Sequence, residues 1–471
     1  MKICIVCEGS YPYITGGVST WVNTLINGLP EFEFIIYAIG AKSTDRGKFK
    51  YTLPDNVLHV HEIFMDECLD QKAKAIKKSI TDKKNRETIK QLITGACIDW
   101  RRLFEYIRSI KVDRIIDFFM SRDFFEIIRE VYEESFSHLA FSEFFWTLRS
   151  MLLPLLYVIR QEVPKADIYH SVSAGYGGVL GALGGYLYNK PYILTEHGIY
   201  AREREEEIIK SEWIIKGFKN DWINFFYNLS RCSYDNACRV ITLFGRNRDI
   251  EIELGCERNK ITIIPNGVSC NALFEKPKRN KDGYINIGAV VRVVPIKDIK
   301  TMLQAFSTVK SSIDKARLYI MGPVDEDMEY YEECKKLVEY LEASDIYFTG
   351  TVNVNDYLGD MDILLLSSIS EGQPLAILEG MAAGKPFVAT DVGSCRELLY
   401  GDNDNFGKAG IVVPVMQPDL MAEAIIKLCS DPQLRETMGS NGKKRVSELY
   451  TMERFISSYR KIYFDEAGRD E

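Results

Sequence analysis

Short apolar runs and longer mixed segments alternate along most of the chain. The runs at residues 363–366 and 386–390 enclose a segment of helical character, so they predict a strand, a loop, a helix and a second, parallel strand. Further strands are predicted at residues 2–7, 34–39, 57–61, 167–170, 191–195, 261–264, 284–291, 316–321 and 346–350. This alternation indicates an α/β fold built on parallel sheets.

Residues 64–163 follow a different pattern. They are rich in Lys, Glu, Ile and Phe, and Gly95 is the only glycine among them. Apolar residues recur at helical spacing, for instance over residues 123–134. We therefore expect a helical insertion in the first domain. The pattern leaves open whether the insertion covers one side of a binding cleft, binds a partner protein or has no direct role.

Composition narrows the class of protein. The chain has 471 residues, enough for two or three domains, and its 46% hydrophobic content predicts packed cores. Its net charge of −8 argues against general nucleic-acid binding. The 11 cysteines are scattered and form no close-spaced Cys/His ligand set, which is typical of a reduced, cytosolic chain.

Two apolar segments must be distinguished from a signal peptide and from a membrane-spanning helix. The apolar run at the N-terminus is too short for a signal peptide. Residues 171–188 are uncharged, but they hold six glycines and several polar groups, and a strand follows soon after. We interpret this stretch as a tightly packed helix between two strands.

The strongest candidates for functional residues follow the strand at residues 363–366. Glu371 lies in the loop after this strand, and Glu379, with seven residues between them, lies on the helix that Pro374 begins. Ligands of open α/β sheets bind at the carboxyl ends of the strands, and the first amides of a helix attract anions. Two carboxylates can accept hydrogen bonds from hydroxyls while the amides bind phosphate, a combination that suits a sugar nucleotide.

A basic pair follows the strand at residues 284–291. Arg292 can form a fork around phosphate oxygens, and Lys297 supplies a point charge five residues later. A solvated basic pair is the alternative, but the acidic balance of the whole chain favours a functional role.

Two candidates lie in the first domain. Gly16 and Gly17 stand between the first strand and a helix, where glycine allows close approach of a ligand to the backbone, although a plain tight turn would look the same. His197 follows the strand at residues 191–195. Its position suits chemistry, but a single His is more often structural.

Three strings resemble one enzyme family. The string E-G-Q-P-L-A-I-L-E, followed by A-A-G-K-P-F-V-A-T-D-V-G, resembles the E-x7-E motif of the retaining glycosyltransferases of family 4, which have the GT-B fold. The strings T-E-H-G-I-Y-x-R-E-R-E and E-G-x-Y-P-Y-x-x-G-G-V-S-x-W are similar to those of the Pel-type (PelF) bacterial exopolysaccharide glycosyltransferases.

This resemblance implies a role for each candidate. Glu371 would bind hydroxyls of the donor sugar and Glu379 the nucleotide ribose. Arg292 and Lys297 would bind the donor diphosphate, and His197 would contact the sugar beside the reacting carbon. The remaining donor-binding candidates are Gly16, Gly17, Gly350, Val352, Gly372, Gln373, Pro374 and Leu375.

The resemblance also implies an architecture. We expect two Rossmann-like domains that face each other across a cleft. The first would span residues 1–275, with the insertion at about 64–163, and the C-terminal helix at 450–471 would rejoin it. The second, nucleotide-sugar-binding domain would span residues 276–449, after a linker at residues 271–283.

The implied function is retaining transfer of a hexose from a UDP-sugar, with UDP-glucose as first choice, to a growing polysaccharide of the Pel type. No metal ion and no cofactor are expected. The chain would act in the cytoplasm, at the inner face of the membrane through partner proteins that export the polymer, and it would not bind nucleic acid. Two alternatives stay open, a UDP-sugar epimerase of similar fold and a nucleotide-binding subunit without turnover.

Overall fold

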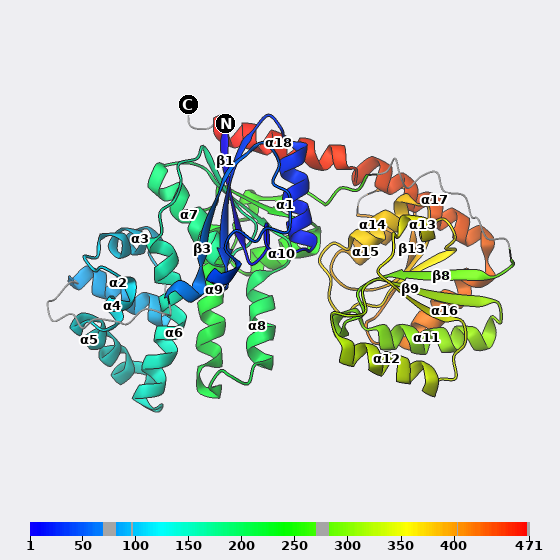
Figure 1. The fold of residues 1–471 in the computed structure, drawn as a ribbon, viewed down its shortest axis with the longest axis horizontal. Helices are drawn as coiled ribbons and strands as arrows, with labels where there is room; N and C mark the ends of the chain where they lie inside the picture. Colours follow the sequence, from blue (N-terminus) through cyan, green and yellow to red (C-terminus); the bar gives the residue numbers. More distant parts are fainter. Residues whose placement is uncertain (69–81, 96–97, 270–281, 403, 469–471) are drawn as a thin grey trace. The chain divides into compact units, whose positions relative to one another are not determined.

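The computed structural model describes residues 1–68, 82–95, 98–269, 282–402 and 404–468. The chain forms two compact units (Figure 1). Unit 1 comprises Met1–Thr242, Arg248–Thr262 and Tyr459–Glu471, and unit 2 comprises Leu243–Asn247 and Ile263–Ser458. Except for its last two residues, the expected linker at 271–283 lies outside the described residues.

Unit 1 is built on a seven-stranded sheet with the order β3-β2-β1-β4-β5-β6-β7. The strands are β1 (Lys2–Glu8), β2 (Glu33–Gly40), β3 (Val57–Phe64), β4 (Ile168–Ser171), β5 (Tyr192–Glu196), β6 (Arg239–Thr242) and β7 (Ile261–Ile263). All pairs from β3 to β6 are parallel. The strand order reverses at β1, which lies between β2 and β4, and such a reversal is where open α/β sheets bind ligands.

Glycines let a helix pack closely on this sheet. Besides α7 (Tyr176–Tyr188), the helices outside the insertion are α1 (Gly17–Gly28), α8 (Tyr200–Lys210), α9 (Lys219–Asn236), α10 (Gly245–Glu253) and α18 (Met452–Ala467). A Cβ at Gly181 or Gly184 of α7 would lie 2.4 Å from the ring of Tyr192 or Tyr169. The interpretation of residues 171–188 as a tightly packed helix is therefore confirmed.

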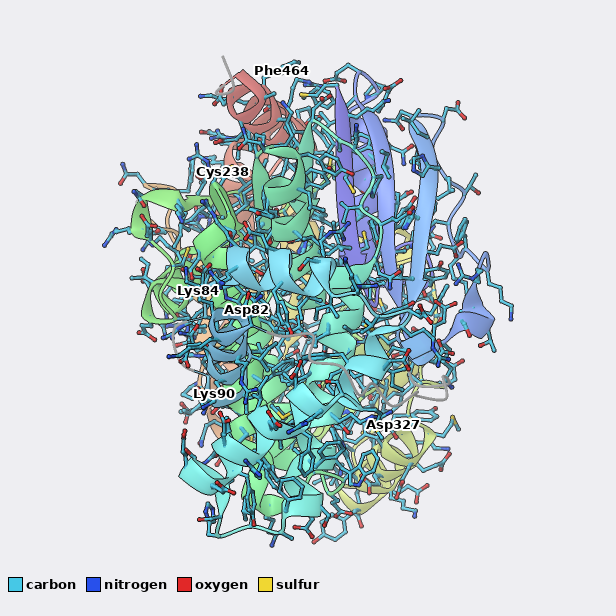
Figure 2. The ribbon with its side chains drawn as sticks, turned by 90° about the vertical axis from the view of Figure 1, so that its left-hand side faces the viewer. Asp82, Lys84, Lys90, Cys238, Asp327 and Phe464 are labelled. Atoms are coloured by element: carbon cyan, nitrogen blue, oxygen red, sulfur yellow. The ribbon has the colours of Figure 1, made fainter. Side chains whose placement is uncertain are left out.

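The predicted helical insertion is also confirmed, because helices alone occupy the described chain between β3 and β4. They are a 3₁₀ helix at Met65–Cys68, α2 (Lys83–Thr94), α3 (Trp100–Ser109), α4 (Ile115–Phe119), α5 (Arg122–Val131) and α6 (Phe141–Arg160), with a π-helical turn at Tyr132–Phe136. Asp82 caps α2 by accepting the N–H of Asn85 at 2.8 Å. Lys90, labelled in Figure 2, joins α2 to α5 through an ion pair with Glu130, 2.8 Å between Nζ and Oε2.

In the described ranges no single helix has the length and apolar character needed to cross a membrane. The segments Arg122–Phe136 and Phe141–Arg160 meet that criterion only as a pair, by length and composition, and the pair is bent by 115°.

Unit 2 contains a six-stranded parallel sheet with the order β10-β9-β8-β11-β12-β13. The strands are β8 (Ile285–Val290), β9 (Ala316–Met321), β10 (Ile346–Gly350), β11 (Ile363–Leu366), β12 (Phe387–Thr390) and β13 (Gly410–Val413). Its helices are α11 (Ile299–Ser312), α12 (Met328–Tyr340), α13 (Asn355–Leu358), α14 (Leu375–Ala382), α15 (Cys395–Tyr400), α16 (Pro418–Ser430) and α17 (Pro432–Leu449). Here the strand order reverses at β8, which lies beside β11.

The last helix completes the core of unit 1. Tyr459 and Tyr463 of α18 are fully buried. The Tyr463 hydroxyl lies 2.7 Å from Nδ1 of His170, and the Tyr459 hydroxyl lies 3.1 Å from Oγ1 of Thr195. Because both partners belong to the central strands β4 and β5, the C-terminal half of α18 is part of this core.

Candidate active site

The predicted residues divide between the two units. Gly16, Gly17 and His197 belong to unit 1, and all the others belong to unit 2.

In unit 2 the structure brings Lys297 and Glu371 together. Nζ of Lys297 lies 2.6 Å from Oε1 of Glu371, and only 17% and 11% of the two side chains are exposed. The Ser368 hydroxyl donates to the same carboxylate oxygen at 2.5 Å. Since β8 and β11 are neighbours, the loops that follow them supply this cation and this carboxylate to the same edge of the sheet.

Backbone contacts fix the two loops to each other. The N–H of Ile369 donates to the carbonyl of Ile296 at 2.9 Å. The Ser367 hydroxyl donates to the carbonyl of Lys297 at 2.8 Å. The ion pair is therefore held on a rigid frame, which favours a preorganised polar site.

The helix that follows Glu371 begins one residue later than predicted. α14 starts at Leu375, and Pro374 is its N-cap rather than part of its first turn. The reason is the backbone of Pro374, whose ψ of 114° is extended. Proline has no side-chain cap to offer, so the first N–H groups of α14 are not capped by a side chain. Such a helix start favours an anion.

The loop before α14 is held by Ser394. Both the N–H and the hydroxyl of Ser394 donate to the carbonyl of Gly372, at 3.0 and 3.2 Å. Gly393, with φ of +50°, makes this approach possible, because a Cβ there would lie 2.2 Å from the same oxygen. Gly372 is therefore positioned through its carbonyl.

Glu379 lies on α14 and is half-buried. Burial raises the pKa of this carboxyl above its ordinary value. Within the described residues no hydrogen bond or ion pair involves its side chain. A half-buried carboxyl without a partner is unfavourable unless a ligand supplies donors.

The second predicted cation forms an ion pair of its own. Nη1 of Arg292 lies 2.6 Å from Oε2 of Glu326, and 53% and 40% of these side chains are exposed. Arg292 therefore carries an exposed counter-ion that the sequence did not indicate.

The remaining candidates of unit 2 differ in their packing and hydrogen bonds. Gly350 has φ of +66° and open space where a Cβ would lie. Val352 packs partly against the core. Gln373 is buried, and its side chain accepts the N–H of Asn266 at 2.5 Å and donates to the carbonyl of Leu243 at 3.5 Å. Its side-chain amide thus bonds to the backbone of unit 2, so the predicted contact with the sugar donor would come from its main chain.

In unit 1 the two glycines precede α1. Gly16 is the N-cap of α1, again without a side-chain cap. A Cβ at Gly16 or Gly17 would meet nothing within 4 Å, and Gly16 has an extended backbone that any residue adopts. Packing therefore does not require glycine at either position, so a reason outside the fold, such as close approach of a ligand, is favoured.

His197 follows β5 and rests against Trp21. The two ring centroids are 4.8 Å apart in an edge-on arrangement. Burial lowers the pKa of His197 to about 4, so the imidazole is neutral at neutral pH. Its Nε2 is buried and has no hydrogen-bond partner in the described part of the chain.

Sequence reasoning missed the residues that support these candidates. Glu196 was visible in the T-E-H-G string, but nothing local marked it as fully buried. Glu8, at the end of β1, accepts the N–H of Gly177 at 2.9 Å and the hydroxyl of Tyr200 at 3.2 Å. Trp21 was visible only as the last letter of the N-terminal string.

Comparison with known families decides the class. A model of a domain of unknown function (DUF3492) matches residues 1–259, which is more than half of the chain. The chain belongs to this family. A second model, glycosyl transferases group 1, matches residues 272–445. The protein is therefore a glycosyltransferase, and the part of the chain that carries the Lys297–Glu371 pair matches the group 1 model.

Curated relatives agree with this class, and solved structures share the fold. An uncharacterized glycosyltransferase of Methanocaldococcus jannaschii is 27% identical over 304 residues, which cover 63% of this chain and 75% of the relative. The N-acetyl-alpha-D-glucosaminyl L-malate synthase of Bacillus anthracis is 29% identical over 176 residues, 37% of this chain and 44% of that enzyme. The crystal structure of HepE from Anabaena in complex with UDP has a TM-score of 0.63 at 14% identity, over 99% of this chain and 100% of HepE. The likeness to HepE shows the shared GT-B fold.

Proposed function

We propose that this glycosyltransferase transfers a hexose from a UDP-sugar to a growing exopolysaccharide, with retention at the anomeric carbon. The observation that carries the proposal is the Lys297–Glu371 pair beside the start of α14. A cation and a helix start suit a diphosphate, and a carboxylate next to them suits the hydroxyls of the attached sugar.

The donor would be held by four groups of unit 2. Lys297 and Arg292 would bind the diphosphate together with the first amides of α14. Glu371 would accept hydrogen bonds from sugar hydroxyls, and Glu379 from those of the ribose. The raised pKa of Glu379 fits a carboxyl whose site is completed by a ligand.

The chemical step needs no dedicated base. The bond between the anomeric carbon and the diphosphate oxygen breaks, and UDP leaves with the electron pair. The acceptor oxygen bonds to the same face of that carbon, and its proton passes to an oxygen of the departing phosphate. Lys297 and Arg292 would stabilise the charge that develops on UDP, and no metal ion would be required.

Unit 1 would contribute the acceptor side. Neutral His197 would contact the sugar near the reacting carbon, and Gly16 and Gly17 would allow a ligand to approach the start of α1. UDP as the nucleotide is supported by HepE, whose structures were solved with UDP and with UDP-glucose. A Pel-type polymer, made at the inner face of the membrane with export partners, rests on the T-E-H-G-I-Y and E-G-x-Y-P-Y strings.

The test is an assay of the purified chain with UDP-glucose, with and without an oligosaccharide acceptor. We expect UDP release that depends on the acceptor and persists in EDTA, and an axial anomeric product by NMR. UDP release that EDTA abolishes, or a product of inverted configuration, would contradict metal-independent retention. Appearance of an epimer of the donor would indicate an isomerase, and binding without turnover would indicate a nucleotide-binding subunit.

A further inference from the structure

A three-residue loop joins β5 to α8, and Glu196 closes it. Glu196 is the last residue of β5, and the loop of His197, Gly198 and Ile199 follows. Its Oε1 accepts the N–H of Tyr200, the first residue of α8, at 2.9 Å. Its Oε2 accepts the hydroxyl of Tyr234 at 2.7 Å. The carboxyl of Glu196 therefore ties both ends of the loop that carries His197.

A second carboxyl, Glu251 on α10, is buried nearby. β5 pairs with β6 so that Glu196 lies opposite Thr242, and the Thr242 side chain faces Glu251. Glu251 is 0% exposed. Neither of its oxygens makes a well-formed hydrogen bond with any described residue, and the Thr242 hydroxyl makes none either.

Among the residues that the structure describes, the groups that face this pair supply no positive charge. Tyr234 of α9 and Cys256 after α10 lie within electrostatic reach of both carboxyls, and Glu203 of α8 lies within reach of Glu196. Lys260, which faces Cys256, pairs with Glu257 at 3.0 Å and donates to two backbone carbonyls. Two ionised carboxylates in such surroundings would repel each other at low dielectric.

Hydrogen bonding decides which of the two carries the charge. Burial raises the pKa of both carboxyls, and repulsion adds to it, from Glu196 on Glu251 and from Glu203 on Glu196. Glu196 accepts two hydrogen bonds, which favour its ionised form, whereas Glu251 accepts none that is well formed. We infer that Glu251 holds a proton at neutral pH and is thereby a positioning residue, which keeps Glu196 ionised and the His197 loop closed. The link to catalysis rests on the role proposed for His197.

The sign of the pH effect follows from proton binding. The folded chain keeps a proton on Glu251 at pH values where the unfolded chain has lost it. This contribution to stability is full below the ordinary glutamate pKa of about 4.5 and is lost as the pH rises toward the folded value. Alkaline pH should therefore weaken unit 1 and release the loop.

The test measures Tm from pH 6 to 10 for the whole chain and for two variants. Gln cannot ionise, so E251Q should flatten the fall of Tm with pH and melt about 2–4 °C above wild type at pH 9. The matched control is E253Q on the same helix, whose side chain is 67% exposed, and its curve should stay parallel to wild type. Parallel curves for E251Q and wild type would overturn the inference. If E251Q does not fold, E196Q should flatten the same curve by removing the repulsion from the other side.

Two further readouts separate positioning from mere stability. The chain has five His, so the ring signal of His197 can be assigned by NMR. It should shift and broaden at alkaline pH in the wild type but not in E251Q. The alkaline fall of kcat should likewise be absent in E251Q, with KM for the donor unchanged.

The failure of this inference and the failure of the proposed function are distinguishable. The Tm curves and the His197 signal need no turnover, so they decide the inference even if no UDP-sugar is a substrate. A His197 signal with the same pH dependence in both proteins would overturn the positioning role while leaving glycosyl transfer intact.

Discussion

Glu371 in unit 2 and Glu196 in unit 1 both follow or end a parallel strand, yet their surroundings are opposite. Glu371 has the Lys297 ammonium at 2.6 Å, close to a helix start without a side-chain cap. Glu196 has an amide and a phenol as its hydrogen-bond donors among the described residues, and a second carboxyl is buried nearby. A carboxylate with a cation can remain charged while a charged ligand arrives and leaves. A carboxylate with neutral donors is suited to hold a loop.

The largest effect is expected from a variant that breaks the Lys297–Glu371 ion pair in unit 2. Replacing Lys297 with Ala removes the cation beside Glu371, so we expect a loss in kcat of about 10²–10³-fold, the range for removal of one preorganised charge-stabilising group. Steady-state kinetics of UDP release measures it. K335A is the control, because Lys335 lies on α12 in an exposed pair with Glu332. Equal rates for K297A and wild type would remove Lys297 from the site.

The second prediction concerns Glu196, whose carboxyl holds the His197 loop of unit 1 closed. Glu196→Ala leaves the N–H of Tyr200 and the hydroxyl of Tyr234 without their acceptor in a buried site. Each unsatisfied buried group costs about 1–3 kcal/mol, so the free energy of unfolding should fall by at least that range. Urea denaturation followed by fluorescence measures the change. A loss as small as that of E253Q would mean that the closure contributes nothing.

The third prediction sharpens the comparison within unit 2. Both oxygens of ionised Glu379 are strong acceptors for hydroxyls, whereas protonation turns one of them into a donor. Burial raises the pKa of this carboxyl, so UDP affinity should fall as the pH drops toward that raised value. E379Q should bind about tenfold more weakly at neutral pH, about 1.4 kcal/mol, and should lose this pH dependence. Calorimetric titration with UDP between pH 5 and 8 measures both. An unchanged pH dependence in E379Q would contradict contact with the ribose.

The smallest effect is expected at Arg292. Its partner Glu326 is exposed, and exposed ion pairs contribute about 0–1 kcal/mol. E326Q should therefore leave Tm within about 2 °C of wild type. It should also bind UDP slightly more tightly at low salt, because Arg292 no longer has a competing carboxylate. Weaker binding by E326Q would contradict the role proposed for Arg292.

Most strands and helices could be predicted because each strand is marked by a short apolar run in the local sequence. A run such as Ile363–Leu366 is apolar throughout, since both faces of a parallel sheet are covered. β13 was missed because it is short and begins with Gly410, where a Cβ would lie 2.4 Å from the carbonyl of Phe387. A glycine in a strand weakens the local signal, and only the neighbouring strand explains it.

Site residues could be predicted where they follow strands, and not where they depend on distant partners. Lys297 and Glu371 were predicted because parallel strands bring their carboxyl ends to one edge. Glu326 and Glu251 were not, because each meets its partner only through tertiary packing. The segment of α10 around Glu251 has little apolar periodicity, so its buried face cannot be read from the pattern.

The aromatic residues of α18 have a consequence for biosynthesis. Tyr459 and Tyr463 contact Thr195 and His170 at the centre of the seven-stranded sheet. The ribosome adds these two tyrosines only after all six strands of the other sheet. The domain whose strands emerge first must therefore wait, with its middle open, until the neighbouring domain has been translated. Nascent chains stalled before residue 459 should expose that middle to chaperones and proteases.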